Sequence, residues 1–190
     1  RQAFLDKAED KDGVIVLRGQ GPLNDYREFR QDNNFWYLTG VSTPDAVYVL
    51  VPKTGEEFFL VPRVDPKDER WLGDLIDPVE AAKLTGIATC TKTDKDGNDW
   101  GNLEALMEKL AKKHHTFYTQ KEPAENWQMS RDNLKGWVAA VANDPLDGRL
   151  SREEQFAARL AEKFGVKVND LSLLVDNLRL GQINLIVMLL

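Results

Sequence analysis

Residues 29–40, Phe-Arg-Gln-Asp-Asn-Asn-Phe-Trp-Tyr-Leu-Thr-Gly, constrain the fold of this chain more than any other stretch. Polar residues lead directly into three consecutive aromatic rings, and a Thr-Gly pair ends the run. In a strand, Phe35 and Tyr37 would lie on one face and Trp36 on the other. Because both faces would be apolar, the stretch predicts a central strand that is covered on two sides and entered through a polar loop.

Three further stretches favour β-structure in the first third of the chain. Residues 14–17 are a β-branched run between two glycines, which is typical of a buried strand. Residues 45–51 and 57–61 are apolar runs joined by Pro-Lys-Thr-Gly, and they predict a β-hairpin. With residues 35–38, this hairpin would form an antiparallel meander.

The remainder of the chain alternates between helical and strand signals. Residues 100–113 carry leucines and a methionine at three-and-four spacing, which predicts an amphipathic helix. Residues 89–98 are polar and favour no regular element. The other expected elements are a helix end at 2–9, capped helices at 65–73 and 77–86, helices at 134–142 and 152–164, strands at 115–120 and 166–169, and a final turn or helix at 171–180. This order predicts an α/β domain with a mixed β-sheet flanked by helices.

Charge and composition exclude several classes of partner. The formal net charge is −6, so the chain lacks the basic excess that nucleic-acid binding requires. The apolar run at residues 183–190 is too short to span a bilayer, so no membrane contact is expected. The lone Cys90 favours a reducing compartment such as the cytoplasm. Because the sequence opens at Arg1 rather than Met, a secreted or periplasmic location stays open.

No stretch of the sequence predicts an active site. The two histidines, His114 and His115, are adjacent, so their side chains diverge and cannot grip one ion together. No serine or cysteine stands in a nucleophile motif. We therefore expect no catalytic residue, no metal ligand and no bound cofactor in these 190 residues.

Residues 30–40, followed by Pro44-Asp45-Ala46-Val47, resemble the signature of the N-terminal domain of Xaa-Pro aminopeptidases (aminopeptidase P). Creatinases and prolidases share this domain more loosely. The resemblance is strong over residues 14–76 and weaker over 118–180. It implies a creatinase-type N-terminal domain with a ribonuclease H-like motif over residues 1–180, and an inactive piece of a metallopeptidase that releases an N-terminal residue preceding proline.

The resemblance also implies partners and site residues. In the family, two manganese ions are held by a following catalytic domain, whose ligand motifs are absent from this sequence. The N-terminal domain contributes oligomer contacts and part of the pocket for a peptide with proline in second position. Trp71 is similar to a family ring near the substrate, and Asn24-Asp25 to a loop that reaches a neighbouring subunit's site. The alternatives are a half-buried helix anchor for Trp71 and a turn residue for Asp25.

Residues 181–190 depart from the family pattern, which continues with a helix rich in Lys and Glu. They form an atypical apolar tail, and the departure leaves open whether a catalytic domain follows. The alternative function is a stand-alone module that binds peptides or proteins on the same fold without catalysis. A creatinase or prolidase parent is a third possibility, which the sequence separates poorly from the first.

Overall fold

The computed structural model describes residues 2–8, 12–22, 29–63, 69–70, 75–121, 146 and 150–189, with side chains described up to residue 179. Its centre is a six-stranded sheet in the order β4-β3-β2-β1-β5-β6. The strands are β1 (Val14–Arg18), β2 (Val47–Val51), β3 (Glu56–Val61), β4 (Thr89–Lys92), β5 (Thr116–Thr119) and β6 (Lys167–Asp170). β2 runs antiparallel to both β1 and β3, whereas the pairs β3–β4, β1–β5 and β5–β6 are parallel. The sheet is therefore mixed, as expected.

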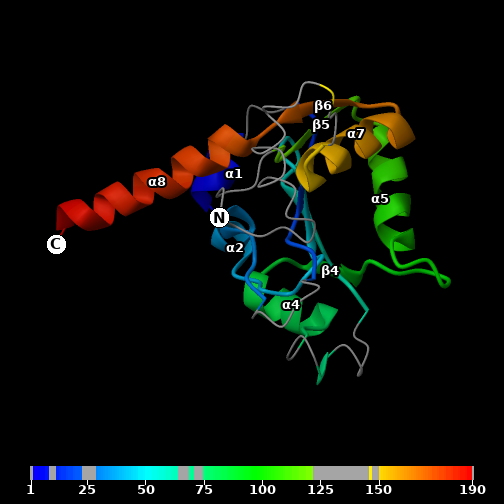
Figure 1. The fold of residues 1–190 in the computed structure, drawn as a ribbon, viewed down its shortest axis with the longest axis horizontal. Helices are drawn as coiled ribbons and strands as arrows, with labels where there is room; N and C mark the ends of the chain where they lie inside the picture. The colour runs from blue at the N-terminus through cyan, green and yellow to red at the C-terminus, as the bar shows by residue number, and fades with distance from the viewer. Residues whose placement is uncertain are drawn as a thin grey trace.

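Helices cover both faces of this sheet (Figure 1). One face carries α1 (Gln2–Ala8), α2 (Asn33–Thr39), α4 (Pro78–Thr85) and the start of α8 (Ser172–Leu189), and the other carries α5 (Gly101–Ala111) and α7 (Arg152–Phe164). The described chain is thus a three-layer α/β structure. From its first turns on the sheet, α8 projects away from the layers and ends at the far tip of the molecule.

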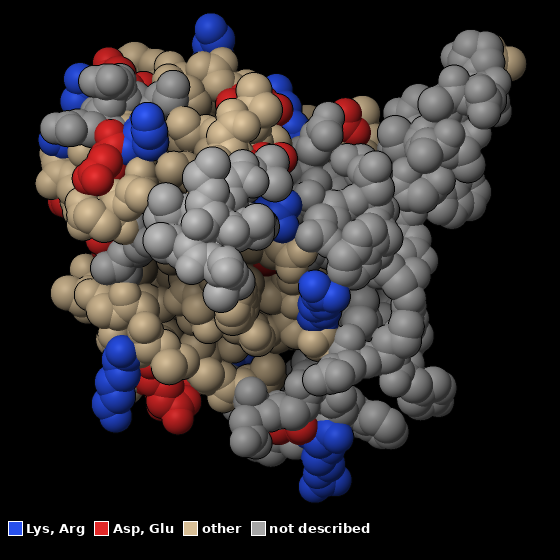
Figure 2. Space-filling model, turned by 90° about the vertical axis from the view of Figure 1, so that its left-hand side faces the viewer, with Lys and Arg blue, Asp and Glu red and all other residues tan. Residues whose placement is uncertain are grey.

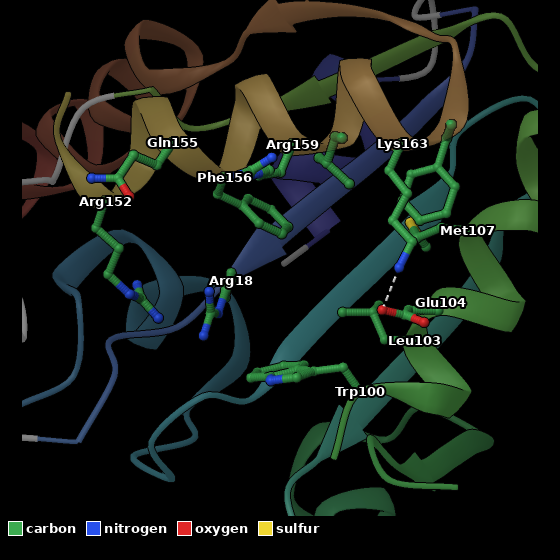
Figure 3. A pocket seen from close by; sticks show the side chains of 12 residues that line it. Arg18, Trp100, Leu103, Glu104, Met107, Arg152, Gln155, Phe156, Arg159 and Lys163 are labelled. Atoms are coloured by element: carbon green, nitrogen blue, oxygen red, sulfur yellow. Dashed lines mark hydrogen bonds and ion pairs between the residues drawn. The ribbon is translucent and has the colours of Figure 1, made fainter. Parts of the chain in front are cut away.

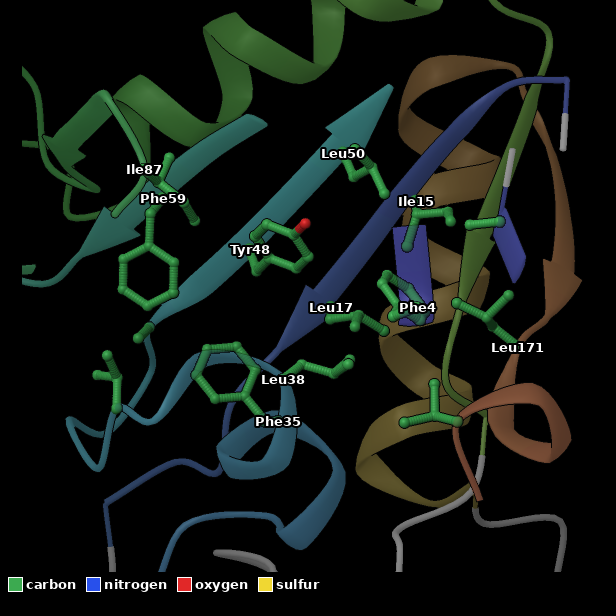
Figure 4. Close-up of a cluster of buried hydrophobic side chains, with 14 of the residues drawn as sticks. Phe4, Ile15, Leu17, Phe35, Leu38, Tyr48, Leu50, Phe59, Ile87 and Leu171 are labelled. Atoms are coloured by element: carbon green, nitrogen blue, oxygen red, sulfur yellow. The ribbon is translucent and has the colours of Figure 1, made fainter. Parts of the chain in front are cut away.

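Alternate residues of the strands β1, β2 and β3 contribute to two separate apolar clusters. Ile15 and Leu17 of β1 pack with Phe4, Phe35 and other buried residues on the α1–α2 side (Figure 4). Their neighbours Val14 and Val16 pack on the opposite side with residues of α5 and α7. Because β1 is buried on both faces, its short β-branched sequence has no polar alternation.

The prediction of a strand at residues 35–38 is wrong, because these residues lie in helix α2. Asp32 caps the helix, its carboxylate accepting a 2.9 Å hydrogen bond from the Phe35 N–H, and Gly40 ends it with a φ of 70°. Phe35 and Leu38 are buried at helical spacing, whereas Trp36 is 55% exposed. The third strand of the meander is therefore β1, which pairs with β2.

The β2–β3 hairpin, α5, α7, β5 and β6 are confirmed near their predicted bounds. The helix expected after Asp77 is also confirmed, as α4, and Asp77 and Glu80 form a capping box at its start. This helix is the crossover between the parallel strands β3 and β4. The expectation of no regular element at residues 89–98 is wrong for β4. Its side chains are mostly exposed, so backbone pairing at the sheet edge leaves no apolar pattern in the sequence.

Other expectations fall partly or wholly outside the described residues. The predicted helix at 134–142 lies outside, and of the one at 65–73 only residues 69–70 are described, as helical. The backbone of α8 continues as one helix past residue 180, where the predicted tail begins. No helix in the described part of the chain is long and apolar enough to cross a membrane.

Charged side chains of both signs are interspersed on the face shown in Figure 2. Lysines and arginines alternate there with aspartates and glutamates around neutral surface, without a broad field of one sign among the described residues.

Candidate functional site

The site residues expected from the sequence, Asn24, Asp25 and Trp71, all lie outside the described residues. Their roles in substrate binding therefore stay predictions. The described elements on either side of Asn24 and Asp25 in sequence are β1 and the signature helix α2. The segments that follow these two elements meet near the end of β1, around the buried Gln31.

Gln31 joins the loop after β1 to the loop after α2. Its side-chain oxygen accepts a hydrogen bond from the Gln20 N–H, and its side-chain nitrogen donates to the Thr43 carbonyl at 2.9 Å. The residue is 3% exposed, so these bonds form away from water. A Cβ on Gly19 would lie 2.8 Å from the Gln31 amide nitrogen, so only glycine lets the two segments approach this closely. The signature thus fixes the backbone at the end of β1.

Asp45, in the turn before β2, bridges two arginines. One carboxylate oxygen lies 2.7 Å from Nη2 of Arg18 and 3.0 Å from Nη2 of Arg152, the first residue of α7. Asp45 has a φ of 53°, a left-handed conformation that aspartate tolerates better than most residues. Arg152 also donates to the Gly19 carbonyl at 3.0 Å. The cluster ties α7 to the ends of β1 and β2.

The two guanidinium groups of this cluster affect each other electrostatically. Burial of the Arg152 side chain, followed by the nearby charge of Arg18, lowers the pKa of Arg152 from its ordinary value, while Asp45 opposes the shift. An arginine stays protonated over the physiological range even so. Two positive charges therefore share one carboxylate oxygen, and the cluster keeps a positive balance.

A groove of about 690 Å³ opens beside this cluster, between α5 and α7 (Figure 3). Arg18 lies at one end of it, with its guanidinium carbon 4.5 Å from the centre of the Trp100 ring and 5.8 Å from that of Phe156. Both distances fall within the range of cation–π attraction. The other described lining residues are Leu103, Glu104, Met107, Arg152, Gln155, Arg159, Leu160, Lys163 and Phe164.

An ion pair crosses the other end of the groove. Lys163 Nζ of α7 lies 2.5 Å from Glu104 Oε1 of α5. The hydrogen bond from Lys163 is the main reason why the pKa of Glu104 is lowered. Both side chains are substantially exposed, so the pair adds little to stability and can exchange partners readily.

Possible metal ligands do not cluster in the part of the chain that the structure describes. Among the described residues, no group of three or more His, Cys, Asp and Glu side chains is placed to hold a metal ion. A metal site of the kind that the resemblance implies is therefore not found in the described part of this chain. Burial raises the pKa of the Cys90 thiol, which donates to the Ile87 carbonyl, so this cysteine is not an activated nucleophile.

Sequence reasoning missed the arginine–aspartate cluster. The sequence places Asp45 only in the signature and at the start of the strand expected at 45–51, and it assigns no role to Arg18. A signal was present at Arg18, because a charged residue that directly continues a buried β-branched strand needs a partner near the end of that strand. Arg152 carries no such signal, since the sequence does not reveal that the start of α7 meets β1.

Fold and site together define an α/β domain with a groove that is lined by apolar and charged side chains. The sequence matches the family model of the aminopeptidase P N-terminal domain over residues 1–118. This match covers more than half of the 190 residues, and the chain belongs to that family.

Curated relatives and solved structures agree with the family. A probable Xaa-Pro aminopeptidase of Sclerotinia sclerotiorum is 30% identical over 93 residues, which cover 46% of this chain and 17% of that protein. Xaa-Pro aminopeptidase 3 of Homo sapiens is 40% identical over 65 residues, covering 31% of this chain and 13% of that protein. The chain thus spans less than a fifth of the length of these relatives.

The fold of this chain is also similar to that of aminopeptidase P structures. An aminopeptidase P structure from Bacillus anthracis matches with a TM-score of 0.67 at 20% identity, over 94% of this chain and 38% of that one. At this identity the match shows the fold alone. It confirms the α/β architecture expected from the sequence.

Proposed function

We propose that this chain is the non-catalytic N-terminal domain of an Xaa-Pro aminopeptidase. It acts beside a catalytic domain of the same polypeptide that removes an N-terminal residue preceding proline. The observation that carries the proposal is the family match over residues 1–118. The two curated relatives support it, because both are named Xaa-Pro aminopeptidases and both extend well beyond the matched segment.

In this proposal the domain contributes oligomer contacts and part of the substrate pocket. Trp71 supplies an apolar wall for the peptide, and Asn24-Asp25 reaches the site of a neighbouring subunit. The family's metal pair, two manganese ions, belongs to the catalytic domain, where it would activate the attacking water. The present residues bind and orient the substrate but transfer no proton.

The first test asks whether the 190-residue chain hydrolyses peptides by itself. We expect no release of the N-terminal residue from an Ala-Pro-Ala peptide in the presence of Mn²⁺, because no group of His, Cys, Asp and Glu among the described residues is placed to hold a metal ion. The measurement is product formation by chromatography over several hours. Turnover that follows the protein through purification would overturn the assignment as non-catalytic.

The second test uses the full-length polypeptide that carries this domain. Trp71→Ala should raise KM for the Ala-Pro peptide by roughly tenfold, because a ring that binds substrate contributes on the order of 1–3 kcal/mol. Trp36→Ala removes an exposed indole from α2 and serves as the matched control. Equal kinetics for the two variants would contradict a substrate role for Trp71.

A further inference from the structure

The groove between α5 and α7 has the two properties of a small-molecule site. Its volume of about 690 Å³ lies within the range of ligand pockets, about 300–1,000 Å³. Its lining is mixed, with apolar side chains from both helices beside a few convergent charged groups. The apolar lining residues are Leu103, Met107, Phe156, Leu160 and Phe164, with the Trp100 ring at one end.

The charge of the groove opposes that of the chain. Among its described lining residues, Glu104 is the one carboxylate, against four cations: Arg18, Arg152, Arg159 and Lys163. The chain as a whole carries a formal net charge of −6. Asp45 pairs with Arg18 and Arg152, Glu162 with Arg159 and Glu104 with Lys163, so four cations face three carboxylates. The remaining positive balance lies at the arginine pair and attracts anions to that part of the groove.

The arginine pair retains binding capacity after its internal contacts are made. Asp45 offers a single oxygen to both guanidinium groups, so most of their N–H donors do not point at it. The Arg18 side chain is 24% exposed, so part of its guanidinium is accessible, whereas its Nε is buried and has no hydrogen-bond partner among the described residues. A guanidinium fork pairs well with the two oxygens of a carboxylate or a phosphate. The Arg18 guanidinium can therefore donate hydrogen bonds to an oxyanion beside the apolar lining residues of the groove.

We propose that the α5–α7 groove binds a small amphipathic anion. Its carboxylate or phosphate pairs with Arg18 beside Arg152, and its aromatic or aliphatic body lies over Phe156, Leu160 and Met107. Trp100 and Phe156 hold Arg18 in place by cation–π contact, so the guanidinium is preorganised for the anion. This site is additional to the proposed handling of peptide substrate and does not depend on it.

The test uses three probes that share one apolar body: 2-naphthoate, 2-naphthyl phosphate and 2-naphthol. Each is titrated into the ¹⁵N-labelled 190-residue chain, and the indole N–H signal of Trp100, assigned by comparison with Trp100→Phe, reports binding. We expect the two anions to shift this signal with saturable curves and the neutral naphthol to bind roughly tenfold or more weakly. The tighter of the two anions identifies the head group that the site prefers.

Two variants locate the anion. Arg18→Met removes the charge at similar length and should weaken the better anion roughly tenfold, whereas Lys53→Gln removes an exposed charge from the β2–β3 turn and should leave binding unchanged. Equal binding of naphthol and the anions would overturn the proposal, as would an unmoved Trp100 signal. The comparison of probes on the unaltered chain decides the question even if Arg18→Met fails to fold.

Discussion

At the scale of single residues, the polar residues that precede the aromatic rings of the signature form hydrogen bonds from their side chains to the backbone. Gln31 bonds to both the segment after β1 and the segment after α2, and Asp32 caps α2. A sequence pattern can show that Gln31 is unusual, but not what it contacts, because its partners Gln20 and Thr43 lie 11 and 12 positions away. This is why the polar lead-in was predicted only as a loop.

Replacing Gln31 with alanine should destabilise the chain by about 2–3 kcal/mol, because it leaves buried backbone groups without partners. The free energy of unfolding, measured by urea denaturation, checks the value. The control is Gln2→Ala, which removes an exposed amide that bonds Asp6 within α1 and should change stability by less than about 0.5 kcal/mol. Similar losses of unfolding free energy for both variants would show that the hydrogen bonds of Gln31 do not stabilise the two loops.

At the scale of elements, most helices and strands could be predicted because their apolar faces repeat at a clear period. The error at α2 arose because three adjacent rings favour a strand, while the caps that decide the matter are single residues. Asp32 and Gly40 bracket seven residues, and that spacing was the available signal for a helix. β4 could not be predicted, since an edge strand with exposed side chains depends on backbone bonds alone.

Because α2 is a helix, the neighbouring rings of Phe35 and Trp36 differ in burial and should differ in their contribution to stability. Phe35 is 1% exposed and its ring centre lies 6.0 Å from that of Phe59, so Phe35→Ala should cost about 3–5 kcal/mol of stability. Trp36 is 55% exposed, so Trp36→Ala should cost about 1 kcal/mol or less. Thermal and urea unfolding of both variants test this difference. Large losses for both would instead favour a strand buried on two faces.

At the scale of the whole molecule, α8 is tied to the layers at two places. Asn34 of α2 donates a 2.8 Å hydrogen bond to Asp176 of α8. At the start of the helix, Asp170 accepts hydrogen bonds from the Ser172 N–H and hydroxyl and from the Lys121 N–H, at 3.0, 2.7 and 3.1 Å. The end of β5, the end of β6 and the beginning of α8 therefore share one carboxylate.

This shared carboxylate should make the junction sensitive to acid. Burial alone would raise the pKa of Asp170, but the hydrogen bonds from Ser172 and Lys121 outweigh it, and the pKa is lowered in the folded chain. A lowered folded-state pKa stabilises the fold above the unfolded value, about 3.9, and this contribution is lost as the pH falls through the folded value.

Asp170→Asn should therefore lower the free energy of unfolding at pH 7, and its difference from the parent chain should shrink as the pH falls below about 4. Urea denaturation at a series of pH values measures this. Glu108→Gln, which removes an exposed carboxylate of α5, controls for the loss of one negative charge. A difference that stays constant with pH would exclude the carboxylate as its source.

The position of β1 in the middle of the sheet has a consequence for synthesis. β1 pairs with β2 within about forty residues, but its other edge pairs with β5, about a hundred residues later. On the ribosome, β1, β2 and β3 can associate while the apolar edge of β1 has no neighbour, and this edge is a site for unwanted pairing between nascent chains. The interval until β5 emerges is therefore when this domain most needs a chaperone, and slow translation between residues 61 and 116 would lengthen it.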